Sequence, residues 1–413
     1  MSRKKDVNEI LNEIETNFDI SKLKINDLLL WPHLRYFVAN ALQHKTPPIE
    51  NLKKKTNKLK IIKNAFYGFL NIFKKSDVIF FSTSKERKFE GNLSISKNIN
   101  EIYKKYSNVL LVEHAFDQFH FDLRSVLEKN IISLSLIELL FFILRKIKIL
   151  NYKLTGTDII LSINQKYGIN FDLVSNASKF ITDYYLFKLL LKFKKPKIVY
   201  ITVWYGYGPV VKAAKDLGIK TVEIQHGDIG KHHYSYNMDR IIDSSHYPEY
   251  ILTFSKREAD FLNRQTLKKN NIFKATAVGS FLENKKINLN KEIFKRFKFI
   301  VSMSATINDS EKEYNLLVEL SQKLKEIMFI YIPRRENNFI STENLFVAKK
   351  LTFSDYIPIS DLHLTVRSTC MYEAAFYRKK TLIYTPFIES QKFIDNLKKE
   401  LCKHPNVYRF IEE

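Results

Sequence analysis

Short runs of β-branched and aromatic residues recur along the first part of the chain, and polar or small residues follow each of them. Five of these runs span residues 77–81, 108–112, 197–203, 220–224 and 250–254. Runs of this length that are apolar at nearly every position are typical of strands buried on both faces of a sheet. We therefore predict five strands, each with polar residues at its carboxyl end.

A helix-like segment separates the third run from the fourth. Residues 209–218 place apolar and basic side chains on opposite faces of a helix, and Gly218 closes the segment. A helix between two strands of one sheet acts as a right-handed crossover. This alternation of strands and helices predicts a parallel sheet that helices cover on both faces.

A second series of strand-like runs follows a passage rich in lysine and asparagine at residues 283–291. Its runs span residues 298–302, 327–332, 362–366 and 380–384. We place a domain boundary at this passage and predict two domains, 1–285 with a helical N-terminal extension and 286–413. The expected fold is α/β, with two doubly wound, Rossmann-like domains that face each other across a cleft. Ligands of such sheets bind at the carboxyl ends of the strands.

Length and composition fit this architecture. A chain of 413 residues is long enough for two globular domains. Its two cysteines, Cys370 and Cys402, form neither a disulfide framework nor a metal-ligand pattern, which favours a reducing cytoplasm. No secretory signal is visible at the start of the sequence. The longest apolar run, residues 131–144, contains Glu138 and is shorter than a bilayer span, so we predict a buried helix there.

The formal net charge of +23 has two readings. The lysines form a solvated surface that reflects composition alone, or they attract an anionic phospholipid surface, substrate or nucleic acid. Within residues 52–75, Ile62, Phe66, Phe69 and Phe73 fall on one helical face with lysines nearby. Such a helix either lies on an anionic membrane or packs against the domain core.

The segment Gln225-His226-Gly227 follows the fourth run directly, and Asp228, His232 and His233 come soon after it. Glycine allows the backbone to approach a ligand or to adopt a positive φ, and histidine exchanges protons near neutral pH. We predict that His226 is catalytic and that the segment binds substrate, through Gln225, Gly227, Asp228, His232 and His233. The alternative is a histidine that only hydrogen-bonds its own loop. The segment lacks the cysteines or paired carboxylates of a zinc site.

The second domain offers candidate phosphate ligands after two of its runs. Arg367 is followed by Ser368 and Thr369, which open a helix that carries Glu373. Helix N-termini and guanidinium groups both bind phosphate oxygens, so we also include Arg334 and Arg335. The alternatives are ordinary N-capping by the hydroxyl groups and a surface arginine pair.

Two further strand ends carry candidate chemistry. Trp204 begins a segment of aromatic residues and glycines, suited to stacking on a sugar or a base, but it lacks the GxGxxG spacing of a dinucleotide site. Glu113 and His114 follow the second run and are candidates for acid–base catalysis. A salt bridge or a helix start would explain these two residues equally well.

Several of these segments resemble glycosyltransferases of the GT-B fold, in particular bacterial enzymes that build capsule, lipopolysaccharide or teichoic acid. The resemblance lies in residues 30–35, 223–229, 245–254 and 360–375. It implies transfer of a sugar from a nucleotide-activated donor to a growing surface glycan, with no bound catalytic metal and no tightly bound cofactor. The first domain would bind the acceptor, and the second would bind the nucleotide.

The resemblance also implies roles for residues. Arg334, Arg335, Ser368 and Thr369 would hold phosphates, Glu373 would bind ribose or sugar, and His226 would face the reacting centre. The chain departs from the pattern in two ways: no EX7E carboxylate pair is present, and Arg334 stands where lysine is common.

Two rival interpretations remain open. One is a sugar-nucleotide epimerase or hydrolase of the same fold, and the other is a non-catalytic basic module that binds membrane or nucleic acid. For the favoured interpretation the partners are a nucleotide-sugar donor and a glycan or lipid-linked acceptor, and no nucleic acid is expected. The protein would be cytoplasmic, with peripheral contact to the inner face of an anionic membrane as an open alternative.

Overall fold

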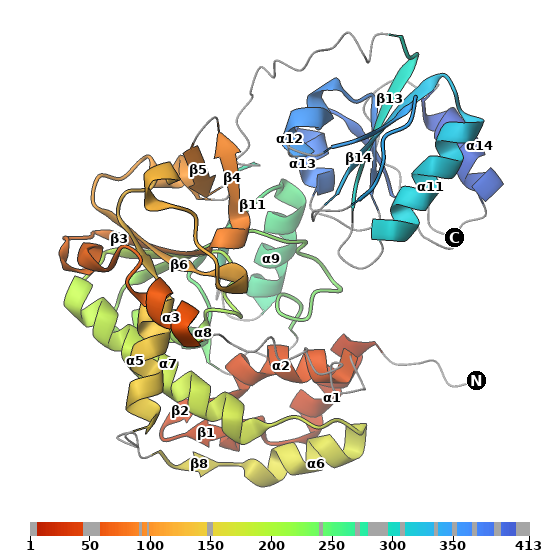
Figure 1. Cartoon of the computed structure of the whole chain (residues 1–413). Helices are drawn as coiled ribbons and strands as arrows, with labels where there is room; N and C mark the ends of the chain where they lie inside the picture. The colour runs from red at the N-terminus through yellow and green to blue at the C-terminus, as the bar shows by residue number, and fades with distance from the viewer. Residues whose placement is uncertain are drawn as a thin grey trace. The chain divides into compact units, whose positions relative to one another are not determined.

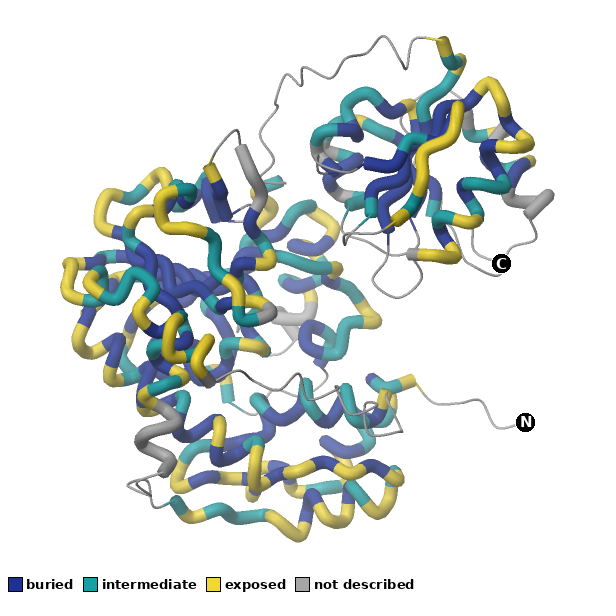
Figure 2. The backbone as a smooth tube through the Cα atoms, in the orientation of Figure 1, coloured by how far each residue is buried: buried dark blue, intermediate teal, exposed yellow. Residues whose placement is uncertain are grey.

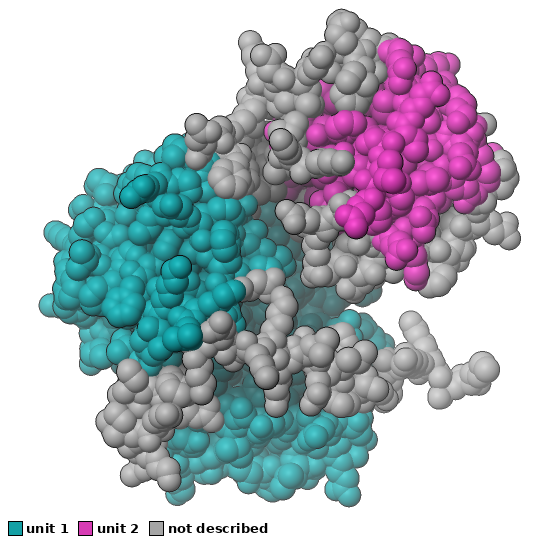
Figure 3. Space-filling view, viewed as in Figure 1, with its two compact units in different colours: residues 1–281 teal, residues 282–413 magenta. Residues whose placement is uncertain are grey.

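The computed structural model describes residues 6–43, 58–90, 93–96, 99–146, 152–238, 243–268, 273–279, 296–305, 310–333, 338–348, 353–365, 370–383 and 390–401. The chain divides into two compact units, Met1–Phe281 and Leu282–Glu413, coloured separately in Figure 3. Each unit has its own sheet and its own hydrophobic core.

The main sheet of the first unit has seven parallel strands in the order β12-β11-β10-β9-β3-β6-β7. Their bounds are β3 Val78–Thr83, β6 Val109–His114, β7 Ile131–Ser133, β9 Ile198–Ile201, β10 Lys220–Ile224, β11 Tyr250–Thr253 and β12 Lys274–Ala277. Chain order runs outward in both directions from the neighbours β3 and β9, so the topological switch point lies between these two strands. The five strands predicted in this part of the chain are confirmed.

Helices connect these strands and cover the sheet (Figure 1). Their bounds are α3 Lys58–Ala65, α4 Asn100–Tyr103, α5 Ser135–Lys146, α7 Leu173–Lys194, α8 Gly208–Asp216 and α9 Lys256–Lys268. Helix α8 is the predicted crossover, and Gly218 follows it with a φ of 68°, a conformation that favours glycine. Helix α7 packs against α8 and α5, and buries Phe180 and Phe187 in the core.

A smaller layer precedes and interrupts this sheet. It contains the helices α1 Val7–Asn17, α2 Trp31–Gln43 and α6 Thr157–Tyr167, and an antiparallel sheet of β1 Lys24–Ile25, β2 Leu28–Leu29 and β8 Leu154–Thr155. Figure 1 shows α1 and α2 lying over these short strands. Leu11, Ile14, Leu34 and Val38 are fully buried and join the core of the first unit. The N-terminal segment is therefore packed as part of this unit.

The second unit contains one sheet of five parallel strands, in the order β15-β14-β13-β16-β17. Its strands are β13 Phe299–Ser304, β14 Ile327–Ile332, β15 Leu345–Val347, β16 Leu362–Thr365 and β17 Lys380–Ile383, and its helices are α11 Ser310–Lys323, α12 Phe353–Tyr356, α13 Cys370–Phe376 and α14 Ser390–Leu401. Figure 2 shows that the strands of both units are largely buried. The predicted α/β class, with two doubly wound parallel sheets, is confirmed.

The helix predicted for residues 131–144 is wrong at its start. Ile131–Ser133 forms β7, which pairs with β6 at the edge of the sheet and is fully buried. Helix α5 begins only at Ser135, because the backbone N–H of Leu134 still donates to the carbonyl of Glu113 in β6. Among the helices of the described ranges, none is long and apolar enough to cross a membrane.

The helical face predicted within residues 52–75 is also interrupted. Residues 52–57 lie outside the described ranges, α3 ends at Ala65, and the 3₁₀ helix Phe69–Phe73 follows Gly68. Gly68 has a φ of 65°, and a Cβ atom there would lie 1.8 Å from the carbonyl oxygen of Ile131. The positive φ turns the chain away from helical geometry, and the close approach to β7 leaves no room for a side chain at Gly68.

We expect Gly68→Ala to destabilise the first unit far more than Gly168→Ala. Both glycines have a φ near +65°, but a Cβ atom at Gly168 meets nothing within 4 Å. Gly168→Ala should cost about 1 kcal/mol through the left-handed backbone alone, and Gly68→Ala should cost about 2 kcal/mol more because the backbone must move. Urea unfolding of the two variants measures both values, and equal losses would contradict the close packing at Gly68.

Candidate active site

The strongest candidate site of the first unit lies at the carboxyl ends of three neighbouring strands, β3, β9 and β10. Parallel pairing brings these ends to one edge of the sheet, next to the switch point, where ligands of such folds bind. The segments that leave the strands are in contact: the hydroxyl of Tyr207, after β9, donates to the carbonyl of Ser82 in β3 over 3.2 Å.

Gln225, the first residue after β10, has a mainly structural set of contacts. Its side chain is fully buried, its Oε1 accepts from the backbone N–H of Phe254 over 2.6 Å, and its Nε2 donates to the carbonyl of Gly227 over 2.8 Å. The carboxamide therefore fastens the end of β10 to the end of β11. Glycine at position 227 was expected to allow either a positive φ or a close approach to a ligand. Gly227 does not have a positive φ, and a Cβ atom there would meet open space.

Glu223 lies inside β10 and was missed by sequence reasoning as a site residue. Its side chain is fully buried, and its Oε1 accepts from the hydroxyl of Tyr236 over 2.6 Å and from the backbone N–H of Trp204 over 3.1 Å. Burial raises the pKa of Glu223 to about 8, although these two hydrogen bonds act in the opposite direction. Near neutral pH this side chain is mostly an uncharged carboxylic acid. The signal in the sequence was a glutamate within an otherwise buried strand.

His226 and His233 are both held as neutral imidazoles. Burial lowers the pKa of His226 to about 4, against a hydrogen bond with the Thr202 backbone, and it lowers the pKa of His233 to about 4 with a further contribution from His226. The Nδ1 of His233 accepts from the backbone N–H of Ser235 over 3.2 Å, and its Nε2 lies 3.5 Å from the hydroxyl of Tyr205.

Aromatic rings surround these histidines. Tyr205 stacks on Tyr36 of α2 with a centroid distance of 4.4 Å, and its ring centroid lies 6.3 Å from that of His226. Tyr236 lies 4.7 Å from His233, and the buried Trp204 lies 6.0 Å from Tyr205. The structure thus brings the predicted residues Trp204, His226 and His233 together, and adds Tyr36, Tyr205 and Tyr236.

Three buried polar atoms of this cluster have no hydrogen-bond partner among the described residues. They are Trp204 Nε1, Glu223 Oε2 and His226 Nδ1. Buried polar atoms in folded proteins are nearly always paired, so unpaired ones that gather at a strand end favour a site that takes up a polar ligand. Asp228 and His232, which were also predicted to bind substrate, are exposed.

The N-terminal helices hold the histidine loop, which we define as residues 230–238. A buried ion pair joins Arg35 of α2 to Glu15 of α1 over 2.6 Å, and Trp31 Nε1 donates to the same carboxylate over 3.0 Å. The guanidinium of Arg35 also donates to the backbone carbonyls of Tyr234 and Asn237. The position of His233 therefore depends on a segment some 200 residues away in the sequence.

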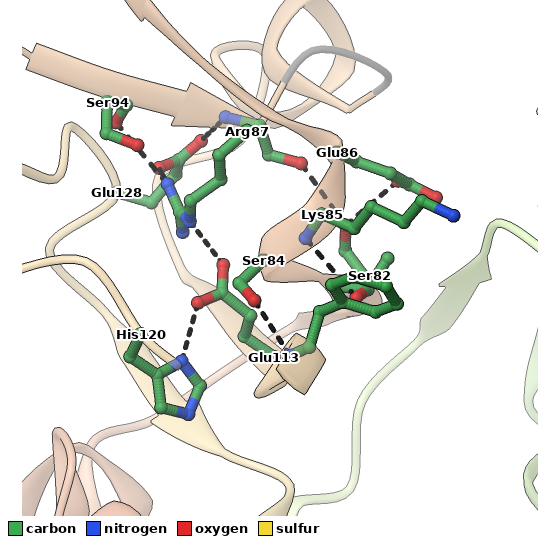
Figure 4. Close-up of polar contacts among 12 residues, drawn as sticks. Ser82, Ser84, Lys85, Glu86, Arg87, Ser94, Glu113, His120 and Glu128 are labelled. Atoms are coloured by element: carbon green, nitrogen blue, oxygen red, sulfur yellow. Dashed lines mark hydrogen bonds and ion pairs between the residues drawn. The ribbon is translucent and has the colours of Figure 1, made fainter. Parts of the chain in front are cut away.

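Glu113, predicted as an acid–base group, lies in a second buried network at the end of β6 (Figure 4). One of its oxygens pairs with Arg87, and the other accepts from His120 Nδ1 over 2.8 Å. Arg87 also pairs with Glu128 over 2.8 Å. His120 Nε2 lies 2.8 Å from the hydroxyl of Ser133. These contacts match the alternative reading of Glu113 as a salt-bridge residue, and its catalytic role stays a prediction, as does that of the half-buried His114.

The predicted phosphate ligands of the second unit are largely outside the described residues. The residues outside the described ranges are Arg334, Arg335, Ser368 and Thr369. Glu373 is described and lies buried on α13. At the switch point of this sheet, between β13 and β16, the described residue that stands out is His363. Its ring lies between the hydroxyls of Ser302 and Ser304 at 3.1 Å and 3.3 Å, and burial lowers its pKa to about 3.

Within the described parts of both units, no group of three or more histidine, cysteine, aspartate or glutamate side chains could hold a metal ion.

No protein-family model matches the chain, and no curated protein matches it significantly. Solved structures of similar fold include the MnaA–UDP complex of S. aureus, with 11% identity and a TM-score of 0.46 over 80% of this chain and 88% of that one. UDP-GlcNAc 2-epimerase of Neisseria meningitidis, bound to UDP-GlcNAc, has 11% identity and a TM-score of 0.45 over 78% and 91%. The glycosyltransferase SnogD of Streptomyces nogalater has 11% identity and a TM-score of 0.43 over 75% and 82%.

These similarities include both epimerases and glycosyltransferases, so they favour neither activity. At this identity and TM-score they say nothing about the residues of a site.

The raised pKa of Glu223 predicts an unusual dependence of stability on pH. Between its ordinary value of 4.5 and about 8, the folded chain keeps a proton on Glu223 that the unfolded chain has lost, so this group's contribution to stability falls as pH rises through that window. Glu223→Gln carries no such proton. Its free energy of unfolding should therefore rise relative to that of the unsubstituted protein, by on the order of 4 kcal/mol between about pH 4.5 and 8.

Denaturant unfolding at several pH values between these limits would measure this difference. Glu326→Gln, at an exposed position of the second unit, is the matched control and should show no such trend. A Glu223→Gln difference that stays constant with pH would mean that Glu223 ionises normally in the folded protein.

Proposed function

We propose that this protein is a glycosyltransferase that moves a sugar from a nucleotide-activated donor to a growing surface glycan. The single observation that supports this best is the cluster at the ends of β9 and β10. It combines aromatic rings, neutral imidazoles, an uncharged carboxyl group and unpaired buried polar atoms. Polar groups set among apolar rings are typical of small-molecule sites.

The groups of the cluster suit a carbohydrate. Sugar rings pack their C–H faces against aromatic rings, and their hydroxyls both donate and accept hydrogen bonds. In its protonated form Glu223 can do either, Trp204 Nε1 can only donate, and an unprotonated Nδ1 of His226 can only accept. We propose that these atoms bind hydroxyls of the acceptor.

In the proposed reaction the acceptor hydroxyl attacks the anomeric carbon of the donor. The bond from this carbon to the acceptor oxygen forms, the bond to the phosphate oxygen breaks, and the nucleotide leaves with the electron pair. The hydroxyl proton passes to the imidazole of His226. Burial keeps this ring unprotonated near neutral pH, so its free nitrogen can take the proton.

The nucleotide is assigned to the second unit in this proposal. Arg334 and Arg335 would pair with the phosphates, since guanidinium groups stabilise the negative charge that develops on the leaving group. Ser368 and Thr369 would donate further hydrogen bonds to the phosphate oxygens, and Glu373 would bind a hydroxyl of ribose or sugar. The protein would work in the cytoplasm, where nucleotide sugars are the donors.

The rival enzyme activity is epimerisation or hydrolysis of the nucleotide sugar, and dependence on an acceptor separates the two. Thermal unfolding with UDP, CDP, GDP, dTDP and CMP, each alone, should identify the donor nucleotide by a raised melting temperature. Turnover of the matching sugar nucleotide should then require an acceptor glycan. Conversion of the sugar nucleotide without any acceptor would support the epimerase or hydrolase, and no melting shift with any nucleotide would contradict both.

We expect His226→Asn to lower kcat by about 100-fold, because it removes the proposed proton acceptor, while the melting shift with nucleotide stays unchanged. Lys231→Asn is the matched control, since this exposed lysine lies five positions further along the same segment, has no proposed role in binding, and should leave kcat unaltered when replaced. Steady-state assays of transfer compare the two variants. Unchanged turnover in His226→Asn would remove His226 from the mechanism.

A further inference from the structure

The segment from α3 to the end of the 3₁₀ helix Phe69–Phe73 exposes large apolar side chains. Ile62, Phe66, Leu70 and Phe73 are 43%, 67%, 75% and 68% exposed. We call these four residues the apolar ridge. Single exposed hydrophobic residues are ordinary on protein surfaces, but four large ones within twelve positions form a contiguous stretch that indicates an interaction surface.

The rest of this segment fixes the ridge firmly to the first unit. Ala65 is buried, and Ile72 packs against the main core. Asn71 Nδ2 donates to the carbonyls of Ile131 and Lys129 over 2.9 Å and 3.1 Å. The inward-facing residues of the segment thus attach it to the first unit, and the outward-facing residues make no contribution to the core.

The ridge continues onto a neighbouring helix. Lys194, at the end of α7, donates from Nζ to the carbonyls of Ile72 and Lys74, which brings this end of α7 against the 3₁₀ helix. Leu189 and Phe193, one turn apart on α7, are 66% and 60% exposed. Helix α5 contacts both α3 and α7, and Figure 1 shows the three helices close together.

The charged side chains of the segment that carries the ridge are all of one sign. Lys60, Lys63, Lys74 and Lys75 are exposed on the same segment, and residues 58–76 contain no aspartate or glutamate. Lys192 and Lys195 flank Phe193 in the same way. Exposed lysines therefore flank the apolar side chains on both segments.

We infer that the apolar ridge and its lysines bind the surface of an anionic lipid bilayer. Phenylalanine and leucine side chains enter the boundary between headgroups and acyl chains, while lysines at the rim pair with lipid phosphates. A second copy of this chain fits the surface poorly, because a two-fold contact would place these lysines against each other. The inference is independent of the proposed transfer chemistry, because a lipid surface can be bound with or without catalysis.

Sedimentation of the full chain with vesicles tests this inference. We expect binding to vesicles that contain phosphatidylglycerol, weaker binding at high salt, and little binding to phosphatidylcholine alone. The triple variant Phe66→Ser, Leu70→Ser, Phe73→Ser should lower the partition coefficient by about tenfold or more. Its circular dichroism spectrum and melting temperature should stay unchanged because all three side chains are exposed.

Two matched variants serve as controls. Leu161→Ser on α6 and Ile340→Ser in the second unit also remove large apolar side chains, 67% and 71% exposed, away from the ridge, and both should keep full vesicle binding. Equal binding by the triple variant, or equal binding to both kinds of vesicle, would overturn the inference. A triple variant that loses self-association while it keeps vesicle binding would instead assign the ridge to contact between copies.

Discussion

The buried pair of Glu15 and Arg35 determines where the histidine loop lies. Arg35 has lost nearly all contact with water, so its guanidinium needs both a counter-charge and acceptors for its remaining N–H groups. Glu15 supplies the first, and carbonyls of the loop supply the second. Without the loop the arginine would keep unsatisfied donors, and without the arginine the loop would lose its attachment to α2. Helices α1 and α2 therefore belong to the candidate site as much as the strand ends do.

Burial keeps the ionisable side chains of this site mostly uncharged. The chain as a whole carries a net charge of +23, yet Glu223, His226 and His233 are predominantly uncharged near neutral pH, since burial disfavours the ionised form of each. The cluster can therefore offer a ligand hydrogen bonds and ring faces with little charge. Other buried carboxylates of the first unit are matched by a cation, as in the network of Arg87 with Glu113 and Glu128.

The main strands could be predicted from the sequence, because short runs of apolar residues are typical of strands that are buried on both faces of a sheet. It failed where contacts between distant residues decide the outcome. Helical spacing continues across Gly68 in the sequence, but α3 ends at Ala65 and Gly68 takes a positive φ against the carbonyl of Ile131. Strands of two residues, such as β1 and β8, leave no pattern to read. In the site, the strand-end position of His226 was visible, whereas Tyr36 and Arg35 reach the loop from nearly 200 positions away. Glu223 was overlooked because the pattern of apolar residues in a strand does not show that a single acidic residue within it is buried.

The amide of Asn71 has a consequence beyond holding the ridge in place. Strand β7 is the last of its sheet, and such a strand offers free backbone groups on which another polypeptide can add as a further strand. Asn71 occupies the carbonyl of Ile131, and the backbone N–H of Ser133 donates to the carbonyl of Tyr67 over 3.1 Å. The same turn that presents apolar side chains outward thus covers the edge of the sheet and protects it from pairing with another chain. Unfolding of this turn would expose the backbone edge of β7 in addition to the apolar ridge.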